Sequence, residues 1–399
     1  MKRRIVAFSV CAIITVISSV LLFSILNNAT SQLPNVTQMN YNYNADFYPI
    51  TISKWEEYQN RFSTTDVSFC SELDETDIKN NMVTPVLTNE NYFSVMSIPI
   101  TGSLKENTKA AAISSDLALK LYFNTNVIGK KIVIGNSEYT ISGVYEKQKG
   151  IVNELSSDDK ERVYLHYSDY SSYKTQEVQS ICYRNDDPSA PLIEQMDFSQ
   201  YHLENIGEKA KILNNFKSLF FLMIFISLSV IALRIWYKLC GRFFSEIKSN
   251  LSENYFFKSV RSIPLKYLLL VVTAAGIPLL IIIVFQLINF SIFIPSKYIP
   301  YDNIFDIPYY FSKIIEHQNE LNSISLNGNT YWLELYKNSF CLLSVLLSCF
   351  IVMYSVLYVI VNSITKRLLC KNSHKEISNL FLGCFAVSIA LCLLILVCV

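Results

Sequence analysis

Five long apolar stretches divide the chain, and each is long enough to cross a membrane as an α-helix. A helix rises about 1.5 Å per residue, so roughly 20 apolar residues cover the hydrocarbon layer of a bilayer. None of the stretches has a charged residue deep in its middle. They are Ile5–Leu26, Phe216–Trp236, Tyr267–Ile294, Phe340–Ile364 and Ile377–Val399. We therefore predict a multi-pass membrane protein with a bundle of about five transmembrane helices.

The segment 27–215, between the first two stretches, has the mixed pattern of a folded α+β domain. Short β-branched or alternating runs predict strands at 83–87, 110–113, 131–134, 139–145, 163–166 and 180–183. Helical spacing is predicted at 91–96, 188–196 and 204–214. The polar region 27–50 lacks periodicity, which is typical of a linker leaving the membrane.

Turn and capping residues sharpen the centre of this domain. Ser114-Ser115-Asp116 precedes a short helical pattern and predicts an N-cap, and Gly129 is expected to end that helix. Gly135-Asn136-Ser137 separates two alternating runs, which predicts a β-hairpin.

Charge sets the predicted orientation, because basic residues are retained on the cytoplasmic side of a membrane. Lys2, Arg3 and Arg4 place the N-terminus in the cytoplasm, and the loops 237–266 and 365–376 are basic as well. Segment 27–215 carries 25 acidic and 16 basic residues and falls outside, as does loop 295–339. The first stretch is longer than the core of a signal peptide, which favours an uncleaved anchor. We expect a cell-membrane protein with residues 27–215 extracytoplasmic.

Eight of the ten cysteines lie in or beside the apolar stretches, where a thiol acts as a small apolar side chain. Cys70 and Cys182 are the two in the outer segment. They could form one disulfide in an oxidising compartment or remain a buried pair of free thiols. The sequence leaves both alternatives open.

The sequence offers no candidate catalytic, cofactor-binding or metal-binding residues. A phosphate-binding Gly-x4-Gly-Lys-[Ser/Thr] motif is absent, so any ATP hydrolysis must come from a partner. The four histidines lie far apart, without the spacing of metal ligands. The basic residues flank apolar runs and form no nucleic-acid-binding stripe. We therefore expect a protein that is not an enzyme and binds no nucleic acid.

Four runs in the outer segment, in order, resemble the MacB-like periplasmic core domain. The run NYFSVMSIPI at 91–100 is similar to a "YFxxMGIP" signature, and AAISSDLALKLY at 111–122 is similar to "VVIS-xxLAxxLF". VIGKKI at 127–132 and YTISGVY at 139–145 resemble the hairpin that follows in that family. The resemblance implies a structural domain and marks no catalytic site.

The rest of the chain resembles the FtsX-like permease module of the same family. The resemblance implies an anchor at 1–26, a core domain at 27–215, a three-span module at 216–364 and an extra C-terminal helix at 377–399. The inner loop is similar to the module's coupling region, although Asn254-Tyr255 replaces a Gly-Ala pair. The residues expected to contact an ATPase are Arg242, Phe243, Phe244, Glu246 and Ile247.

By this resemblance, we predict the permease subunit of an ABC transporter. It would transmit conformational change from a separate cytoplasmic ABC ATPase to its outer domain, for export or mechanical work on the envelope. The implied partners are that ATPase, a second permease copy or paralogue that completes a dimer, and membrane lipid. Two alternatives stay open, namely an uncoupled membrane-anchored receptor or sensor and a regulator of an extracellular cell-wall hydrolase.

Overall fold

The computed structural model describes residues 2–41, 48–59, 66–106, 108–147, 149–156, 160–186, 200–253, 255–287, 290–300, 303, 305–323 and 331–369. The chain forms two compact units. The domain unit contains Ser24–Leu213 and Ile315–Leu343, and the helical unit contains the rest. Each unit is described by itself.

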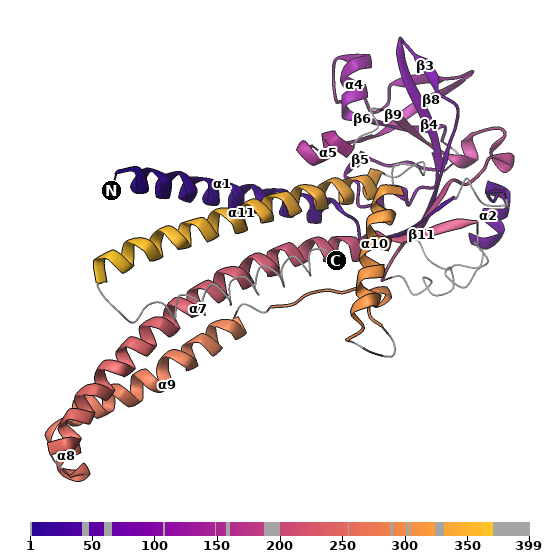
Figure 1. Ribbon diagram of the computed structural model, residues 1–399. Coiled ribbons are helices and arrows are strands. Elements are labelled where there is room, and N and C mark those ends of the chain that lie inside the picture. Colours follow the sequence, from indigo (N-terminus) through magenta and orange to yellow (C-terminus); the bar gives the residue numbers. More distant parts are fainter. Residues whose placement is uncertain are drawn as a thin grey trace. The chain divides into compact units, whose positions relative to one another are not determined.

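The domain unit is built on one sheet of eleven described strands (Figure 1). The strands are β1 (Val36–Tyr41), β2 (Val67–Glu72), β3 (Thr76–Ile78), β4 (Asn81–Thr88), β5 (Ile100–Gly102), β6 (Ala110–Ser114), β7 (Lys131–Ile134), β8 (Ser137–Tyr145), β9 (Glu161–His166), β10 (Ser180–Arg184) and β11 (Tyr201–Asn205). Their order is β11-β1-β10-β2-β4-β9-β6-β8-β5, with β3 paired to β4 and β7 paired to β8. Pairing is antiparallel except for β4 with β9 and β6 with β8, which run parallel.

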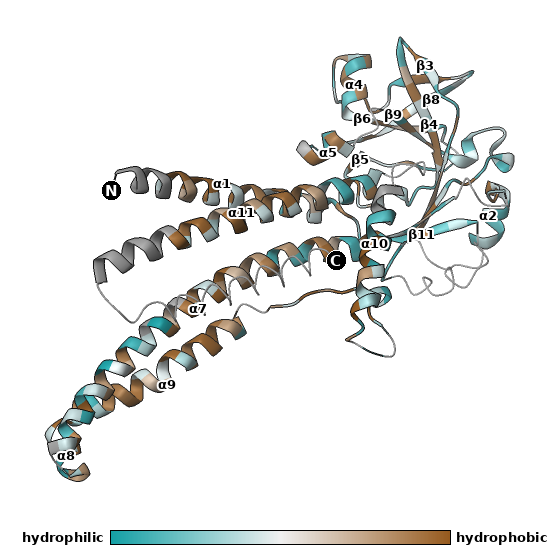
Figure 2. Cartoon of the chain, viewed as in Figure 1, coloured by the Kyte–Doolittle hydropathy of each residue, from teal (hydrophilic) through white to brown (hydrophobic). Residues whose placement is uncertain are grey.

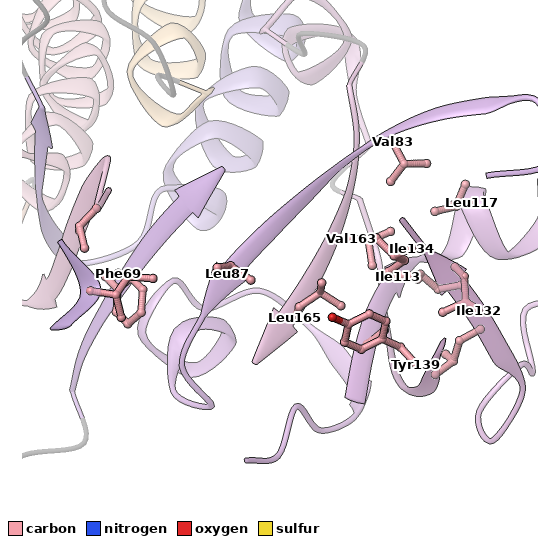
Figure 3. Packing of buried hydrophobic residues seen from close by; sticks show 14 of the residues in the cluster. Phe69, Val83, Leu87, Ile113, Leu117, Ile132, Ile134, Tyr139, Val163 and Leu165 are labelled. Atoms are coloured by element: carbon pink, nitrogen blue, oxygen red, sulfur yellow. The ribbon is translucent and has the colours of Figure 1, made fainter. Parts of the chain in front are cut away.

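Short helices cover this sheet and close its core. They are α2 (Ile52–Gln59), α3 (Tyr92–Val95), α4 (Ser115–Tyr122), α5 (Ile151–Ser156) and the 3₁₀ turns η1 (Tyr167–Asp169) and η2 (Tyr173–Thr175). Apolar side chains of the strands gather with Leu117 of α4, as Figure 3 shows for Val83, Ile113 and Val163. Trp55 of α2 is fully buried 5.9 Å from the ring of Phe69. Burial of such side chains stabilises each by about 1.5–3 kcal/mol.

The predicted strands and the helix cap are confirmed. All six predicted strands lie within β4, β6, β7, β8, β9 and β10. Ser114 caps α4, since its hydroxyl accepts a hydrogen bond from the amide of Leu117 at 3.0 Å. The expected end of this helix is wrong, because Phe123 adopts a left-handed conformation (φ 55°) and ends α4 well before Gly129.

Gly143 has a steric reason to be glycine. A Cβ atom at this position would lie 2.7 Å from Cδ1 of Ile100, on the neighbouring strand β5. A larger residue would require the side chain of Ile100 to move.

The prediction of a linker at 27–50 is wrong. The first helix, α1 (Lys2–Gln32), continues to Gln32, and β1 lies inside the sheet between β10 and β11. The polar side chains of β1 are buried because they are hydrogen-bonded, as Gln38 Nε2 is to Asn40 Oδ1 at 2.7 Å. A buried strand with paired polar residues lacks the apolar alternation by which strands are found.

The helical prediction for 204–214 is partly correct. Residues 204 and 205 belong to β11, and the helix begins at Ile206. The other predicted helix, at 188–196, lies outside the described residues.

The remaining helices are α7 (Ile206–Glu253), α8 (Phe256–Ser262), α9 (Pro264–Leu287), α10 (Ile307–Ser323) and α11 (Tyr331–Leu369), and a 3₁₀ turn, η3 (Ser296–Tyr298), precedes α10. Four described helices, α1, α7, α9 and α11, are long and apolar enough to cross a membrane. They contain the first, second and fourth predicted stretches and the third as far as Leu287, and the fifth, Ile377–Val399, lies outside the described residues.

The inner loop predicted at 237–266 is mostly helical. Helix α7 extends through it to Glu253, and α8 lies at the turn between α7 and α9 (Figure 1). Figure 2 shows this turn with mixed polar and apolar residues, whereas α9 is strongly apolar.

Candidate functional site

The described residues contain no group of three or more His, Cys, Asp or Glu side chains placed to hold a metal ion. The features of interest are instead the two ends of α7. One end, which we call the domain junction, comprises β11, the first residues of α7 and the start of α11. The other, the helical tip, comprises residues 242–262.

An ion cluster fixes the start of α7 at the domain junction. The ammonium of Lys209 lies 2.8 Å from the carboxylate of Glu204, and both side chains are largely buried. His202 Nε2 lies 2.9 Å from the other oxygen of the same carboxylate. Lys209 also lies over the ring of Tyr336 at 5.1 Å from its centroid, which adds a cation–π contact to α11. Lys209 therefore connects strand β11 to two long helices.

The electrostatics of Glu204 reflect this setting. Burial by itself would raise the pKa of its carboxyl, but the hydrogen bond from His202 and the charge of Lys209 lower that pKa to about 2. The carboxylate is therefore the form that the folded domain stabilises.

A chain of asparagines joins neighbouring strands to the same helix. The amide nitrogen of Asn185, just after β10, donates to Asn35 Oδ1 at 2.9 Å and to Asn205 Oδ1 at 3.0 Å. Asn205 Oδ1 also accepts from the backbone amide of Glu208 at 2.9 Å and so caps α7. Thr37 of β1 donates to Asn185 Oδ1 at 2.6 Å. The ends of β1, β10 and β11 are thus bonded to each other and to the start of α7.

The start of α11 is bound to the domain through α5. Asn338 Nδ2 donates to Ser156 Oγ at 2.9 Å and to the carbonyl of Leu155 at 3.2 Å. The hydroxyl of Tyr331 bonds to Asn153 Oδ1 at 3.3 Å. Two helices that continue as candidate membrane spans are therefore held by polar contacts within the domain unit.

Polar contacts also close the helical tip. Glu246 of α7 lies 2.6 Å from Lys266 of α9, and Ser259 of α8 lies 3.0 Å from the hydroxyl of Tyr267. Asn250 and Ser262 bond at 3.4 Å. These contacts hold α7, α8 and the start of α9 as one hairpin.

The structure separates the five residues predicted for ATPase contact. Ile247 is only 4% exposed and belongs to the packing of the hairpin, whereas Phe244 is 62% exposed. Arg242 is also exposed, and Phe243 is half-buried. Glu246 forms an ion pair with Lys266, so we assign it to the contacts that hold α7 against the start of α9. Phe244 and Arg242 remain as the candidates for recognition.

The sequence reasoning missed the aromatic residues at the turn itself. Tyr255 and Phe257 are 91% and 86% exposed, and Phe256 lies between them. A run of three aromatic residues inside a basic loop was the available signal. An exposed aromatic group of this kind is characteristic of a surface that a partner covers.

Cys70 and Cys182, the two cysteines of segment 27–215, are free, buried thiols. Cys70 is opposite Ser180, two residues from Cys182, so the cysteines are diagonal neighbours on one sheet face. Diagonal neighbours lie about 7–8 Å apart, beyond the usual span of a disulfide. Burial raises the pKa of Cys70 to about 12. The structure thus favours the alternative of a buried free pair.

Comparison with known families identifies the domain. Residues 6–193 match the model of the MacB-like periplasmic core domain. This match confirms the resemblance to the MacB/FtsX-like ABC permeases predicted from the four runs at 91–145, and it covers the sheet from β1 to β10.

Two solved structures are similar to part of the chain. The periplasmic region of MacB from Actinobacillus actinomycetemcomitans is 15% identical, with 46% of this chain and 94% of that one covered and a TM-score of 0.35. The extracellular domain of the noncanonic ABC-type transporter YknZ from Gram-positive bacteria is 16% identical, with 40% and 87% covered and a TM-score of 0.30. No curated protein matches the chain. The match to the family model over residues 6–193, and not these two likenesses, supports the similarity to this family.

Proposed function

We propose that this chain is a non-enzymatic permease subunit that transmits conformational change from a separate cytoplasmic ABC ATPase to its extracytoplasmic core domain. The observation that carries the proposal is the combination of a MacB-like core domain with candidate membrane spans and an exposed aromatic tip in one chain. The MacB/FtsX-like resemblance supplies the ATPase as the expected partner.

Charge supports a cytoplasmic helical tip. The segment 237–266 carries Lys238, Arg242, Lys248, Lys258, Arg261 and Lys266, against Glu246 and Glu253. Basic segments of this length beside membrane spans are retained on the cytoplasmic side. Alternation of the spans then puts the N-terminus in the cytoplasm and the core domain outside.

Helix α7 suits a transmitting role because it is continuous from the domain junction to the tip. It has 48 residues, which at about 1.5 Å per residue gives a rod roughly 70 Å long. Polar bonds and an ion cluster fix one end to the sheet. A displacement of the tip by a partner would be passed along the rod to the strands that the junction joins.

The proposed assembly contains two permease chains and two ATPases. Four described spans are few for a bundle on which an ATPase pair closes, so a second copy or a paralogue would complete it. The substrate need not cross the bilayer if the work is done on the core domain.

Co-purification from membranes tests the proposal. The full chain is expressed with an ABC ATPase encoded beside it, and the recovered ATPase and its hydrolysis rate are measured. We expect Phe244→Glu to lower recovery at least tenfold, because it puts a charge into an apolar contact. Phe123→Glu is the matched control, since Phe123 is also exposed but lies in the core domain.

An equal recovery with wild type and Phe244→Glu would overturn the assigned contact. Recovery of the chain alone, with hydrolysis by the neighbouring ATPase unaffected by its deletion, would overturn the permease function. That second outcome would favour an uncoupled receptor, the alternative supported by Asn254-Tyr255 in place of the family's Gly-Ala pair.

A further inference from the structure

Helix α10 has an exposed apolar stripe that belongs neither to the core of the domain unit nor to the helical tip. Ile307, Phe311 and Ile315 follow one another at intervals of four residues and are 64%, 57% and 61% exposed. Residues four apart lie on one face of a helix. Phe305, just before the helix, is also strongly exposed.

The opposite side of α10 is the side that packs. His317 is buried, with its ring 5.7 Å from that of Phe340 in α11. Near the start of the helix, Tyr309 donates its hydroxyl to the carbonyl of Lys297 at 2.9 Å. Because 309 and 317 are two turns apart, they share a face that is turned away from Phe311. The stripe therefore points away from the contacts that hold the helix.

Helix α10 cannot cross a membrane. Its 17 residues span about 25 Å, and they include Lys313, Glu316 and His317. The exposed fractions of its stripe residues are nevertheless close to those of Leu279 and Leu280 in α9, a candidate membrane span. Figure 2 shows the difference, with hydrophobic and hydrophilic residues mixed on α10. A helix with one apolar and one polar face is suited to lie in the plane of a membrane surface.

Contacts within each unit place this region beside the ends of the apolar stretches. The segment before α10 is bonded to the start of the second stretch, because Asn215 Nδ2 donates to the carbonyl of Phe293 at 2.8 Å and Asn215 Oδ1 accepts from its amide at 2.9 Å. The partner of His317, Phe340, is the first residue of the fourth stretch. Both attachments therefore lie at ends of predicted apolar stretches, where a span would leave the hydrocarbon layer.

We propose that α10 is an interfacial helix whose stripe of Ile307, Phe311 and Ile315 binds the lipid of the membrane surface. The apolar side chains enter the boundary between headgroups and acyl chains, and Lys313 and Glu316 lie on the opposite side of the helix, away from the lipid. Tyr298, Tyr309 and Tyr310 suit the same level, where amphipathic aromatic rings collect. The proposal does not depend on an ATPase partner.

Photocrosslinking in the full chain tests the proposal. p-Benzoylphenylalanine is introduced singly at Phe311, Ile307, Leu279 or Phe123, and each variant is irradiated in nanodiscs of phosphatidylcholine and phosphatidylglycerol. Mass spectrometry then measures the fraction of chains that carry a lipid adduct. Leu279, on a candidate span, gives the yield of a lipid-facing position, and Phe123 gives that of an exposed phenylalanine in the core domain.

We expect adduct yields at positions 307 and 311 within about threefold of that at 279 and at least tenfold above that at 123. Yields at 307 and 311 as low as at 123 overturn the proposal. So does a protein–protein crosslink at 311 in place of the lipid adduct, because the stripe then covers a second copy of the chain.

Discussion

The two ends of α7 both contain polar contacts within the chain, but they differ in which side chains they leave exposed. At the domain junction, charged and polar side chains are bonded within the chain, as Lys209 is to Glu204 and Asn185 is to Asn205. At the helical tip, polar contacts close the hairpin and leave Phe244, Tyr255 and Phe257 exposed. The polar groups of the junction are bonded within the chain, whereas the tip leaves three aromatic side chains exposed. Under the proposed function, α7 would be fixed at the junction and would bind its partner at the tip.

The largest effect should follow from removing the cation of the domain junction. Lys209→Met leaves the buried carboxylate of Glu204 without its nearest full charge, and such a loss costs about 3–5 kcal/mol. Guanidinium unfolding of the full chain in detergent measures it through the fluorescence of Trp55, in a background with Trp236→Phe and Trp332→Phe.

Lys131→Met is the matched control for that substitution. Its partner Glu138 lies 2.9 Å away, but both side chains are exposed, so the loss should stay below about 1 kcal/mol. Equal losses in the two variants would contradict the view that the junction is a tightly fixed site.

Low pH should weaken the ion cluster of Glu204 and Lys209 at the domain junction. The pKa of Glu204 is lowered from 4.5 to about 2 in the folded chain, so the carboxylate stabilises the fold above pH 4.5 and this contribution disappears as the pH falls toward 2. The shift corresponds to about 3 kcal/mol. The unfolding free energies of wild type and Glu204→Gln are compared between pH 6 and pH 2, in steps of about one pH unit. The stability difference between the two chains should shrink across this window, and a constant difference would rule the mechanism out.

Local sequence patterns predict the strands and the helix cap of the core domain better than they predict the domain junction. Strand β6 is apolar along most of its length, β4 has Val83, Val86 and Leu87, and Ser114 has the spacing of a cap, so local rules find them. Strand β1 is hidden because Gln38 and Asn40 are buried with each other as partners. Burial of that kind is decided by pairing with β10 and β11, which are about 150 residues away.

The site shows the same limit. Arg242 and Phe244 could be named from a family motif, since the motif lies on one local segment. The motif could not separate Phe244 from Ile247, because exposure depends on how α8 and α9 fold back on α7. The cluster of Lys209 and Glu204 includes Tyr336, which is far away in sequence, and no local sequence pattern predicts that contact.

The smallest change in stability should come from the tip. Phe244→Ser removes a side chain that is already 62% exposed and should alter the unfolding free energy by less than about 0.5 kcal/mol. Ile247→Ala, three residues away, removes a buried side chain and should cost about 2 kcal/mol or more. The two variants should have the reverse order in ATPase recovery, with Phe244→Ser the more damaging. If Ile247→Ala proved worse in both measurements, loss of binding would follow from a disordered hairpin, and the exposed aromatic surface would no longer be needed to explain it.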